Sequence, residues 1–319
     1  MPPPGPATTP RGGATTREEN DPAVICIGVD GGGTSTNVAL SKDGQIREAS
    51  ALAANATTIG IDGAADVIIA AIRDVLGLAR PDAIYIGAAG AGSARVAEGL
   101  QERIAGAFAG AKVVVEDDTA IALRAAIPDG DGAVLIAGTG SVAYAVHGER
   151  THRAGGLGYL AGDEGSAFWI GMQAVKLYGR VLDGRANQDE TTDVVARGLD
   201  APDRERYLAA LYGEPLRPVT IAALAPSIIE LAGEGNRAST KIVQQAAQEL
   251  GDLLRATLKA AGLSDASPAV AFAGGLLREN SLLSFLLETR LIGDVAGIAV
   301  VKGGDEPVRA ALRLAERLG

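Results

Sequence analysis

The sequence predicts a duplicated α/β protein with one cleft between its two halves. Three observations support this fold class. Short apolar segments of strand length alternate with segments in which apolar residues recur at helical spacing. Each half opens in the order strand, turn, strand, turn, strand, and the first turn of each half is rich in Gly and Thr. The length of 319 residues also suits two domains.

The first half is predicted to occupy residues 23–127 in the order βββαβαβα. Its leading strand, residues 24–29, is entirely apolar apart from Gly28 and ends at the turn 30–33. The elements expected after it are strands at 36–40 and 45–49 around a turn at 42–44, a helix at 62–77, a strand at 83–88, a helix at 94–108, a strand at 112–116 and a helix at 119–126. Residues 1–22 lack the apolar segment of a signal peptide and are predicted to be a disordered tail.

The second half is predicted to occupy residues 128–319, because the same order begins again after the Pro- and Gly-rich turn at 128–132. Helices at about 187–235, interrupted by four prolines, are expected as an insertion. The other expected elements are strands at 133–137, 142–146 and 150–154, helices at 166–178 and 239–261, a strand at 269–273, a helix at 279–288, a strand at 298–301 and a helix at 307–318. The last helix is a candidate to pack back on the first half.

Composition and charge exclude several classes of protein. The chain has 29 Lys and Arg against 39 Asp and Glu, a net charge of −10 that repels phosphate backbones and anionic lipid. We therefore expect neither a nucleic acid nor a membrane surface as partner. No apolar stretch reaches the roughly 18 residues of a membrane span, and a cytoplasmic protein is expected. The single cysteine, Cys26, lies in the leading strand and is predicted to be a buried structural thiol.

The two glycine-rich turns suit phosphate binding. Turns 31–34 and 138–141 follow strands and present backbone N–H groups and hydroxyls, which fit phosphate oxygens. Glycine is expected there because a side chain would block close approach and because tight turns need a positive φ. Ordinary hairpin turns are the alternative, but repetition at matching positions favours phosphate. A P-loop is excluded because the chain has no Gly-Lys pair, and a Rossmann site requires a helix where 142–146 indicates a strand.

Three acidic residues follow strands that are expected to meet at the cleft. Asp30 ends the leading strand beside the glycines and can hold a hydrated Mg²⁺ on the phosphates, or simply cap the turn. Asp117 and Asp118 end the strand at 112–116, and neighbouring side chains point in different directions, so we expect only one of them in the cleft. A carboxylate there can accept the proton of an attacking hydroxyl. Capping of the next helix by Asp118 is the alternative.

A third glycine-rich segment, residues 155–166, has five glycines in twelve positions. It precedes an apolar helix, and its composition predicts a loop that approaches a ligand closely. Asp163 and Glu164 can bind sugar hydroxyls or favour the N-terminus of that helix. Ligand binding is the favoured interpretation for Asp163 and helix capping for Glu164.

Together these segments resemble a known family. Asp30-Gly-Gly-Gly-Thr34, Gly138-Thr-Gly-Ser141, Gly162-Asp-Glu-Gly-Ser166 and Ala273-Gly-Gly275 occur in this order. They are similar to the phosphate-1, phosphate-2, sugar-loop and adenosine motifs of the actin, hexokinase and Hsp70 ATPase superfamily. The resemblance is to the BadF/BadG/BcrA/BcrD ATPase family, which contains N-acetylglucosamine kinases and dehydratase-activating ATPases, and it spans residues 24–318. It implies duplicated ribonuclease H-like (actin/hexokinase-type) domains.

The resemblance also implies roles for single residues. It implies that ATP phosphates contact Gly32, Gly33, Thr34, Gly138, Thr139 and Gly140, that adenosine lies against Gly274 and Gly275, and that Asp30 holds Mg²⁺. It implies that Asp118 is the catalytic carboxylate facing a sugar 6-hydroxyl, and that the sugar is bound by Asn55, Gly156, Leu157, Gly158 and Asp163. On its own, Asn55 would be interpreted as a turn residue. The family resemblance further implies a homodimer.

The function predicted from these residues is an ATP-dependent kinase that phosphorylates the 6-hydroxyl of N-acetylglucosamine or a close aminosugar. Leu157 stands where aminosugar kinases usually have Trp, which leaves glucosamine and N-acetylmuramic acid as alternative substrates. A partner-driving ATPase of the same family is the alternative from another class. The activator ATPases hold an iron–sulfur cluster with several Cys thiolates, and the single Cys26 argues against that role.

Overall fold

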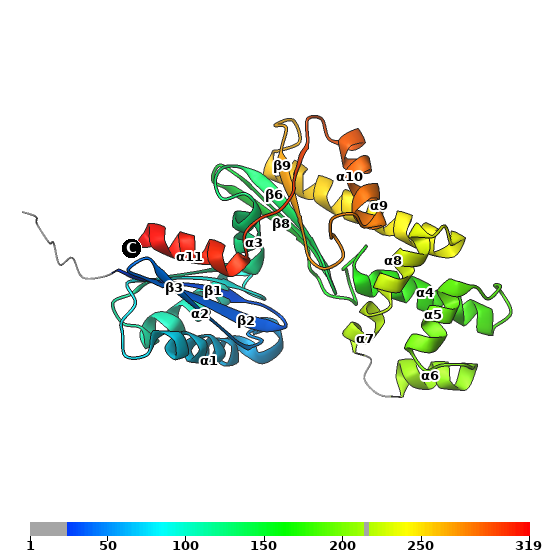
Figure 1. The fold of residues 1–319 in the computed structure, drawn as a ribbon, viewed down its shortest axis with the longest axis horizontal. Helices are drawn as coiled ribbons and strands as arrows, with labels where there is room; N and C mark the ends of the chain where they lie inside the picture. Colours follow the sequence, from blue (N-terminus) through cyan, green and yellow to red (C-terminus); the bar gives the residue numbers. More distant parts are fainter. Residues whose placement is uncertain (1–23, 214–216) are drawn as a thin grey trace, which may run out of the picture.

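The computed structural model describes residues 24–213 and 217–319, and the predicted tail at 1–22 lies outside them. Two five-stranded sheets, each with helices packed on both faces, make up the fold (Figure 1). The first sheet has the order β3-β2-β1-β4-β5 and the second the order β10-β9-β6-β7-β8. In both sheets the leading strand is followed by two antiparallel strands on one side and joined to parallel strands on the other.

The first sheet is built from the expected elements. Its strands are β1 (Ile25–Gly31), β2 (Ser35–Lys42), β3 (Gln45–Leu52), β4 (Ala83–Ala88) and β5 (Lys112–Asp117). The tight turn between β2 and β3 has Asp43 and Gly44 at positive φ, as a two-residue hairpin turn requires. Helices α1 (Ala56–Leu76) and α2 (Ala94–Ala107) cover one face of the sheet, where their apolar side chains pack on alternate residues of β1 and β4.

Helix α1 begins six residues before the predicted start at residue 62. Asn55 caps it by accepting a hydrogen bond from the backbone N–H of Thr57 at 2.9 Å. Gly60, at φ 75° and ψ 171°, interrupts the helix one turn later. Because this kink shifts the apolar spacing, the regular pattern begins only beyond it, and the sequence indicated a later start.

The second half follows the same plan with more helices. Its strands are β6 (Gly132–Ala137), β7 (Ser141–His147), β8 (Arg150–Gly155), β9 (Ala269–Ala273) and β10 (Ala299–Val301). Its helices are α4 (Ala167–Leu182), α5 (Glu190–Gly198), α6 (Arg204–Tyr212), α7 (Pro218–Ala222), α8 (Ala225–Gly233), α9 (Arg237–Ala261) and α10 (Leu282–Asp294). Because β7 is a strand and no helix opens after the turn at 138–140, the fold has no Rossmann fingerprint there.

Two helices connect the halves. Helix α3 (Asp118–Ala126) leaves β5 and packs on β6 and β7 of the second sheet. The terminal helix α11 (Pro307–Leu318) returns to the first half and lies on the face of its sheet opposite α1 and α2 (Figure 1). Gly28 of β1 permits this contact, because a Cβ there would collide with the backbone of Leu312. The carboxyl edge of the first sheet is thereby held close to the second half.

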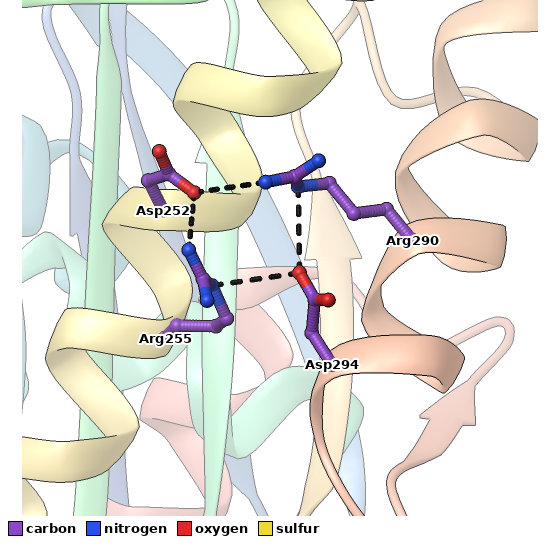
Figure 2. A network of polar contacts seen from close by, with 4 residues as sticks. All are labelled: Asp252, Arg255, Arg290 and Asp294. Carbon is purple, nitrogen blue, oxygen red and sulfur yellow. Dashed lines mark hydrogen bonds and ion pairs between the residues drawn. The ribbon is translucent and has the colours of Figure 1, made fainter.

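Helices α9 and α10 are joined by a closed ring of alternating charges (Figure 2). Asp252 pairs with Arg255 and Arg290, and Asp294 pairs with the same two guanidinium groups at 3.7 and 3.5 Å. The four side chains are all partly exposed, so each ion pair adds little stability on its own. In the part of the chain that the structure describes, no helix combines the length and apolarity needed to span a membrane.

Candidate active site

The carboxyl ends of three parallel strands lie level in the first sheet. Gly31 of β1 pairs with Ala88 of β4, and Ala88 pairs with Asp117 of β5. The turn 32–34, the loop 89–93 and the first turn of α3 therefore lie side by side. The backbone N–H of Ala89 donates to the carbonyl of Gly31 at 2.7 Å, which connects the first two of these segments. This edge is where an open α/β sheet presents ligand-binding groups.

The second sheet presents a matching edge. The turn 138–140 follows β6, and it is tied to the start of α4 by a hydrogen bond from the N–H of Ala167 to the carbonyl of Gly138 at 2.9 Å. The segment after β9 is tied to the same turn, since the N–H of Leu276 donates to the carbonyl of Ala137 at 3.1 Å. The predicted phosphate-2 and adenosine segments, remote in sequence, are thus neighbours.

The glycines of the two phosphate turns have ordinary backbone angles. The expectation that these turns need glycine for a positive φ is therefore wrong. Gly32, Gly33, Gly138 and Gly140 all lie outside the positive-φ region. Close approach remains as the reason: a Cβ at Gly140 would lie 2.8 Å from the carboxylate of Asp163. A Cβ at Gly138 would meet nothing within 4 Å, so its side faces open space where a ligand can approach the backbone.

The turns also offer hydrogen-bond donors to a ligand. Within residues 24–213 and 217–319, the backbone N–H groups of Gly33, Thr34, Thr139 and Gly140 have no acceptor. Gly33, Thr34 and Thr139 are exposed, as are Gly274 and Gly275. Unpaired N–H groups on an accessible turn form a site for phosphate oxygens. The chemistry of these turns is therefore compatible with the predicted contacts to ATP, which stay a prediction.

Asp117 and Asp118 occupy different environments. Asp117 is 9% exposed and caps α3, accepting hydrogen bonds from the backbone N–H and the hydroxyl of Thr119. Arg153 of β8 lies 3.4 Å from the same carboxylate oxygen. The capping role that the sequence offered as the alternative for Asp118 belongs to Asp117 instead. Asp118 is left without a capping role, at the start of α3.

The carboxyl group of Asp118 is tuned by its neighbours. Burial, followed by the negative charges of Asp117 and Asp30, raises the pKa of Asp118 to about 7. The positive charge of Arg153 acts in the opposite direction and lowers this pKa. A carboxylate whose pKa lies near neutral pH is suited to accept a proton and release it again.

Asp30 lies close enough to Asp118 for its negative charge to contribute to raising the pKa of Asp118. Burial raises the pKa of Asp30, while a hydrogen bond from Asn37 opposes the shift. It lines a cavity of about 330 Å³ together with Asn37, Ser50 and Glu306. A carboxylate and further oxygen groups beside a phosphate turn suit Mg²⁺, which takes one or two carboxylates, water and phosphate oxygens. The position of Asp30 therefore fits the predicted ion.

Asn55 lies between two segments of the first edge. Its Oδ1 is used to cap α1, which agrees with the interpretation as a turn residue. Its Nδ2 points to the phosphate-1 turn, 3.7 Å from the place of a Cβ on Gly33. Oδ1 of the amide is therefore used to cap the helix, whereas Nδ2 is directed at the predicted site. The interpretations of Asn55 as a turn residue and as a sugar ligand are compatible.

The loop 155–166 is shaped by residues in left-handed conformations. Gly155, Gly156, Gly158 and Gly165 all have positive φ, and so has Asp163 at 60°, a conformation rare for a non-glycine residue. Asp163 is 8% exposed, and its Oδ1 accepts the N–H of Ser141 at 3.3 Å. The predicted sugar-binding Asp is therefore fixed against the phosphate-2 turn. Leu157, by contrast, is 71% exposed at the tip of the loop and touches the backbone near Gly162.

Two further features of the site were not singled out in the sequence. Arg153 is the cation beside the acidic pair, and Gly90 and Gly92 belong to the loop after β4. A Cβ on Gly90 would lie 3.0 Å from Oδ1 of Asn55, and one on Gly92 would lie 3.1 Å from Oδ2 of Asp117. The run Ala-Gly-Ala-Gly-Ser at 89–93, directly after a buried strand, was a signal that could have identified the loop. Arg153 lies in an exposed strand of mixed polarity, and nothing in its local sequence distinguishes it.

The chain resembles known proteins over most of its length. The chain matches the BadF/BadG/BcrA/BcrD ATPase family over residues 27–303. It belongs to this family. The match covers both sheets as far as the loop before α11, and the family predicted from the four motifs is confirmed.

Several proteins with named activities resemble the chain over most of its length. An N-acetylmuramic acid/N-acetylglucosamine kinase from Clostridium acetobutylicum is 28% identical over 265 residues, which cover 81% of this chain and 87% of the relative. An N-acetyl-D-glucosamine kinase from Dictyostelium discoideum is 26% identical over 318 residues, which cover 91% and 97%. The crystal structure of a proposed N-acetylglucosamine kinase from Chromobacterium violaceum is 25% identical, with a TM-score of 0.70 over 92% of this chain and 99% of that one. The predicted duplicated, ribonuclease H-like (actin/hexokinase-type) fold is confirmed.

Proposed function

We propose that this BadF/BadG/BcrA/BcrD family ATPase is an ATP-dependent kinase that phosphorylates the 6-hydroxyl of N-acetylglucosamine or a close aminosugar. One observation carries the proposal. Asp118, whose pKa is raised to about 7 by burial and neighbouring charges, opens α3 at the same sheet edge as the turn 32–34 and Asp30, in a chain whose relatives are aminosugar kinases. Such a group suits a reaction in which a hydroxyl must lose its proton as it attacks phosphorus.

The proposed step transfers the γ-phosphoryl group of ATP to the sugar. Asp118 accepts the proton of the sugar hydroxyl while that oxygen forms a bond to the γ-phosphorus. The bond from the γ-phosphorus to the bridging oxygen breaks, and ADP leaves with its electron pair. A Mg²⁺ ion held by Asp30 would neutralise charge on the phosphate oxygens.

The remaining residues bind and orient the two substrates. Backbone N–H groups of the turns 32–34 and 138–140 hold the phosphates, and Gly274 and Gly275 leave room for the adenosine. Asn55, Asp163 and the glycines of the loop 156–158 hold the sugar hydroxyls, with Leu157 at the edge of the sugar site. Holding both substrates in one geometry supplies much of the rate enhancement in phosphoryl transfer.

The proposal is tested with the purified full chain, MgATP and a panel of sugars. The panel contains N-acetylglucosamine, glucosamine, N-acetylmuramic acid, N-acetylmannosamine and glucose. ADP release is measured together with the mass of the sugar product, and ³¹P–¹H NMR of that product identifies the phosphorylated hydroxyl. The Asp118→Asn variant is the matched control for contaminating kinases.

A phosphosugar formed by the parent and absent with the variant supports the kinase and identifies its substrate. ATP hydrolysis without any phosphosugar across the panel contradicts it and favours the partner-driving ATPase. The buried Cys26, 2% exposed, offers no ligand for the iron–sulfur cluster of that alternative. The homodimer implied by the family resemblance stays a prediction, which light scattering tests.

A further inference from the structure

Two segments, one from each half of the molecule, meet at the guanidinium group of Arg153. Its Nε lies 3.4 Å from Oδ1 of Asp117, which belongs to the first half. Its Nη1 donates to the carbonyl of Gly155 at 3.2 Å, at the start of the glycine-rich loop of the second half. The guanidinium group therefore bridges the acidic pair and the loop 155–158.

Glycines leave the space that this side chain occupies. A Cβ at Gly156 would lie 2.6 Å from Nη2 of Arg153, and one at Gly92 would lie 3.7 Å from Nε and 3.1 Å from Oδ2 of Asp117. Oδ2 of Asp117 is buried and has no hydrogen-bond partner among the described residues. A buried carboxylate oxygen without a donor is costly, and the guanidinium group 3.4 Å from Oδ1 of the same carboxyl group offsets part of that cost.

We propose that Arg153 is a positioning residue that couples the sugar-binding loop to the catalytic carboxylate across the two halves of the molecule. The inference rests on the proposed kinase function, and it concerns a residue to which the family resemblance assigns no role. When the loop 155–158 closes on a sugar, its movement is transmitted through Arg153 to Asp117, and from there to the adjacent Asp118. A planar guanidinium can hold the two acceptors at once, whereas the single ammonium group of Lys cannot span both in the same geometry.

The charge of Arg153 has a second consequence. The groups that act on Asp118 come from three elements: Asp117 from β5, Asp30 from β1 and Arg153 from β8. Only Arg153 favours the ionised form, which is the form that accepts a proton. Burial raises the pKa of Asp163 in the loop, and the positive charge of Arg153 opposes that shift too. Removing the charge should therefore raise the pKa of Asp118 and leave less of the base ionised at neutral pH.

The test compares Arg153→Gln and Arg153→Lys with a matched control, Arg150→Gln, which removes an exposed arginine from the same strand β8. For Arg153→Gln we expect kcat at pH 7 to fall by at least about tenfold and the acid limb of the kcat profile to move up by about one pH unit. For Arg153→Lys we expect the acid limb to return to that of the parent while kcat stays reduced. For Arg150→Gln we expect no change in either.

A measurement without turnover separates this inference from the proposed function. Aspartate labelled with ¹³C at the carboxyl carbon is titrated by NMR, and the Asp118 signal is identified by its loss in Asp118→Asn. If no sugar is phosphorylated but the Asp118 titration moves up in Arg153→Gln, the kinase proposal fails and the coupling of Arg153 to Asp118 stands. If the acid limb and the titration are both unchanged in a folded Arg153→Gln protein, the inference is wrong.

Discussion

The two halves begin with the same strand order but bring different chemistry to the site. The carboxyl edge of the first sheet carries the acidic side chains Asp30, Asp117 and Asp118. The edge of the second sheet carries mainly backbone groups, in the turn 138–140 and in the left-handed loop 155–165. The duplicated scaffold thus places a cluster of carboxyl groups on one side and mainly backbone groups on the other.

The glycines of the second half serve two different purposes. In the turn 138–140, Gly138 has ordinary φ and faces open space. In the loop 155–165, Gly165 has positive φ and packs against helix α9. Substitution of Asp118 should therefore change turnover, that of Gly138 should change binding, and that of Gly165 should change stability.

The largest effect is expected for Asp118→Asn. The amide cannot accept the hydroxyl proton, so we expect kcat to fall by about 10²- to 10⁴-fold. Sugar KM should change little, because the side chain keeps its size and its place. Steady-state kinetics with the sugar that the parent phosphorylates are the measurement, and unchanged turnover would remove Asp118 from the mechanism.

Gly165→Ala should destabilise the protein through the loop 155–165 and leave the acidic residues of the first sheet in place. The new Cβ would stand in a left-handed conformation, 2.6 Å from Cγ of Leu250 and 2.7 Å from the carbonyl of Ala246. We expect a loss of about 3 kcal/mol in the free energy of unfolding, measured by urea denaturation. Gly158→Ala is the control, because its φ of 85° is equally unfavourable but a Cβ there has open space. Equal losses in both variants would mean that packing against α9 contributes nothing.

Gly138→Ala should separate binding from stability. A methyl group there meets no protein atom within 4 Å, so the free energy of unfolding should stay within about 0.5 kcal/mol of the parent. The same methyl group would occupy the space of a phosphate, and we expect the Kd for MgATP to rise by about tenfold or more. Calorimetric titration measures the affinity, and parent-like binding would contradict the assignment of this turn.

The acidic edge should make stability depend on pH in a defined direction. The pKa of Asp118 is raised to about 7 from an ordinary 3.8, so the fold favours the protonated form. This contribution is complete below about pH 4 and is lost as the pH rises to about 7. Asp118→Asn keeps a neutral group, so the gain in Tm over the parent should be larger at pH 8 than at pH 5 in ligand-free protein. A pH-independent difference would contradict the raised pKa.

The smallest effect is expected in the charge ring behind the loop. Asp252→Asn removes one carboxylate from the network that joins α9 to α10 (Figure 2). Because these side chains are partly exposed, the loss of unfolding free energy should be about 0.5 to 1 kcal/mol and should shrink in high salt. Turnover should be unchanged, and a large loss of activity would place the ring in the second half's binding function.

Much of the fold could be predicted from local pattern. The strands at 83–88 and 269–273 and the terminal helix at 307–318 were predicted with the boundaries that the structure has. They are strongly apolar or strongly amphipathic, and Pro307 marks the start of the last helix. The start of α1 was missed because the kink at Gly60 interrupts the apolar spacing of the helix.

The sequence by itself determined the fold class, the family and the identities of the candidate acidic and glycine residues, because these depend on residue type, spacing and order. Only the tertiary structure decided which of two adjacent carboxylates caps a helix and which is free with a raised pKa. It also decided that Arg153, 36 positions from Asp117 in the sequence, forms an ion pair with that carboxylate. The physical reason is that charge interactions and desolvation depend on distances between segments, which local sequence patterns do not contain.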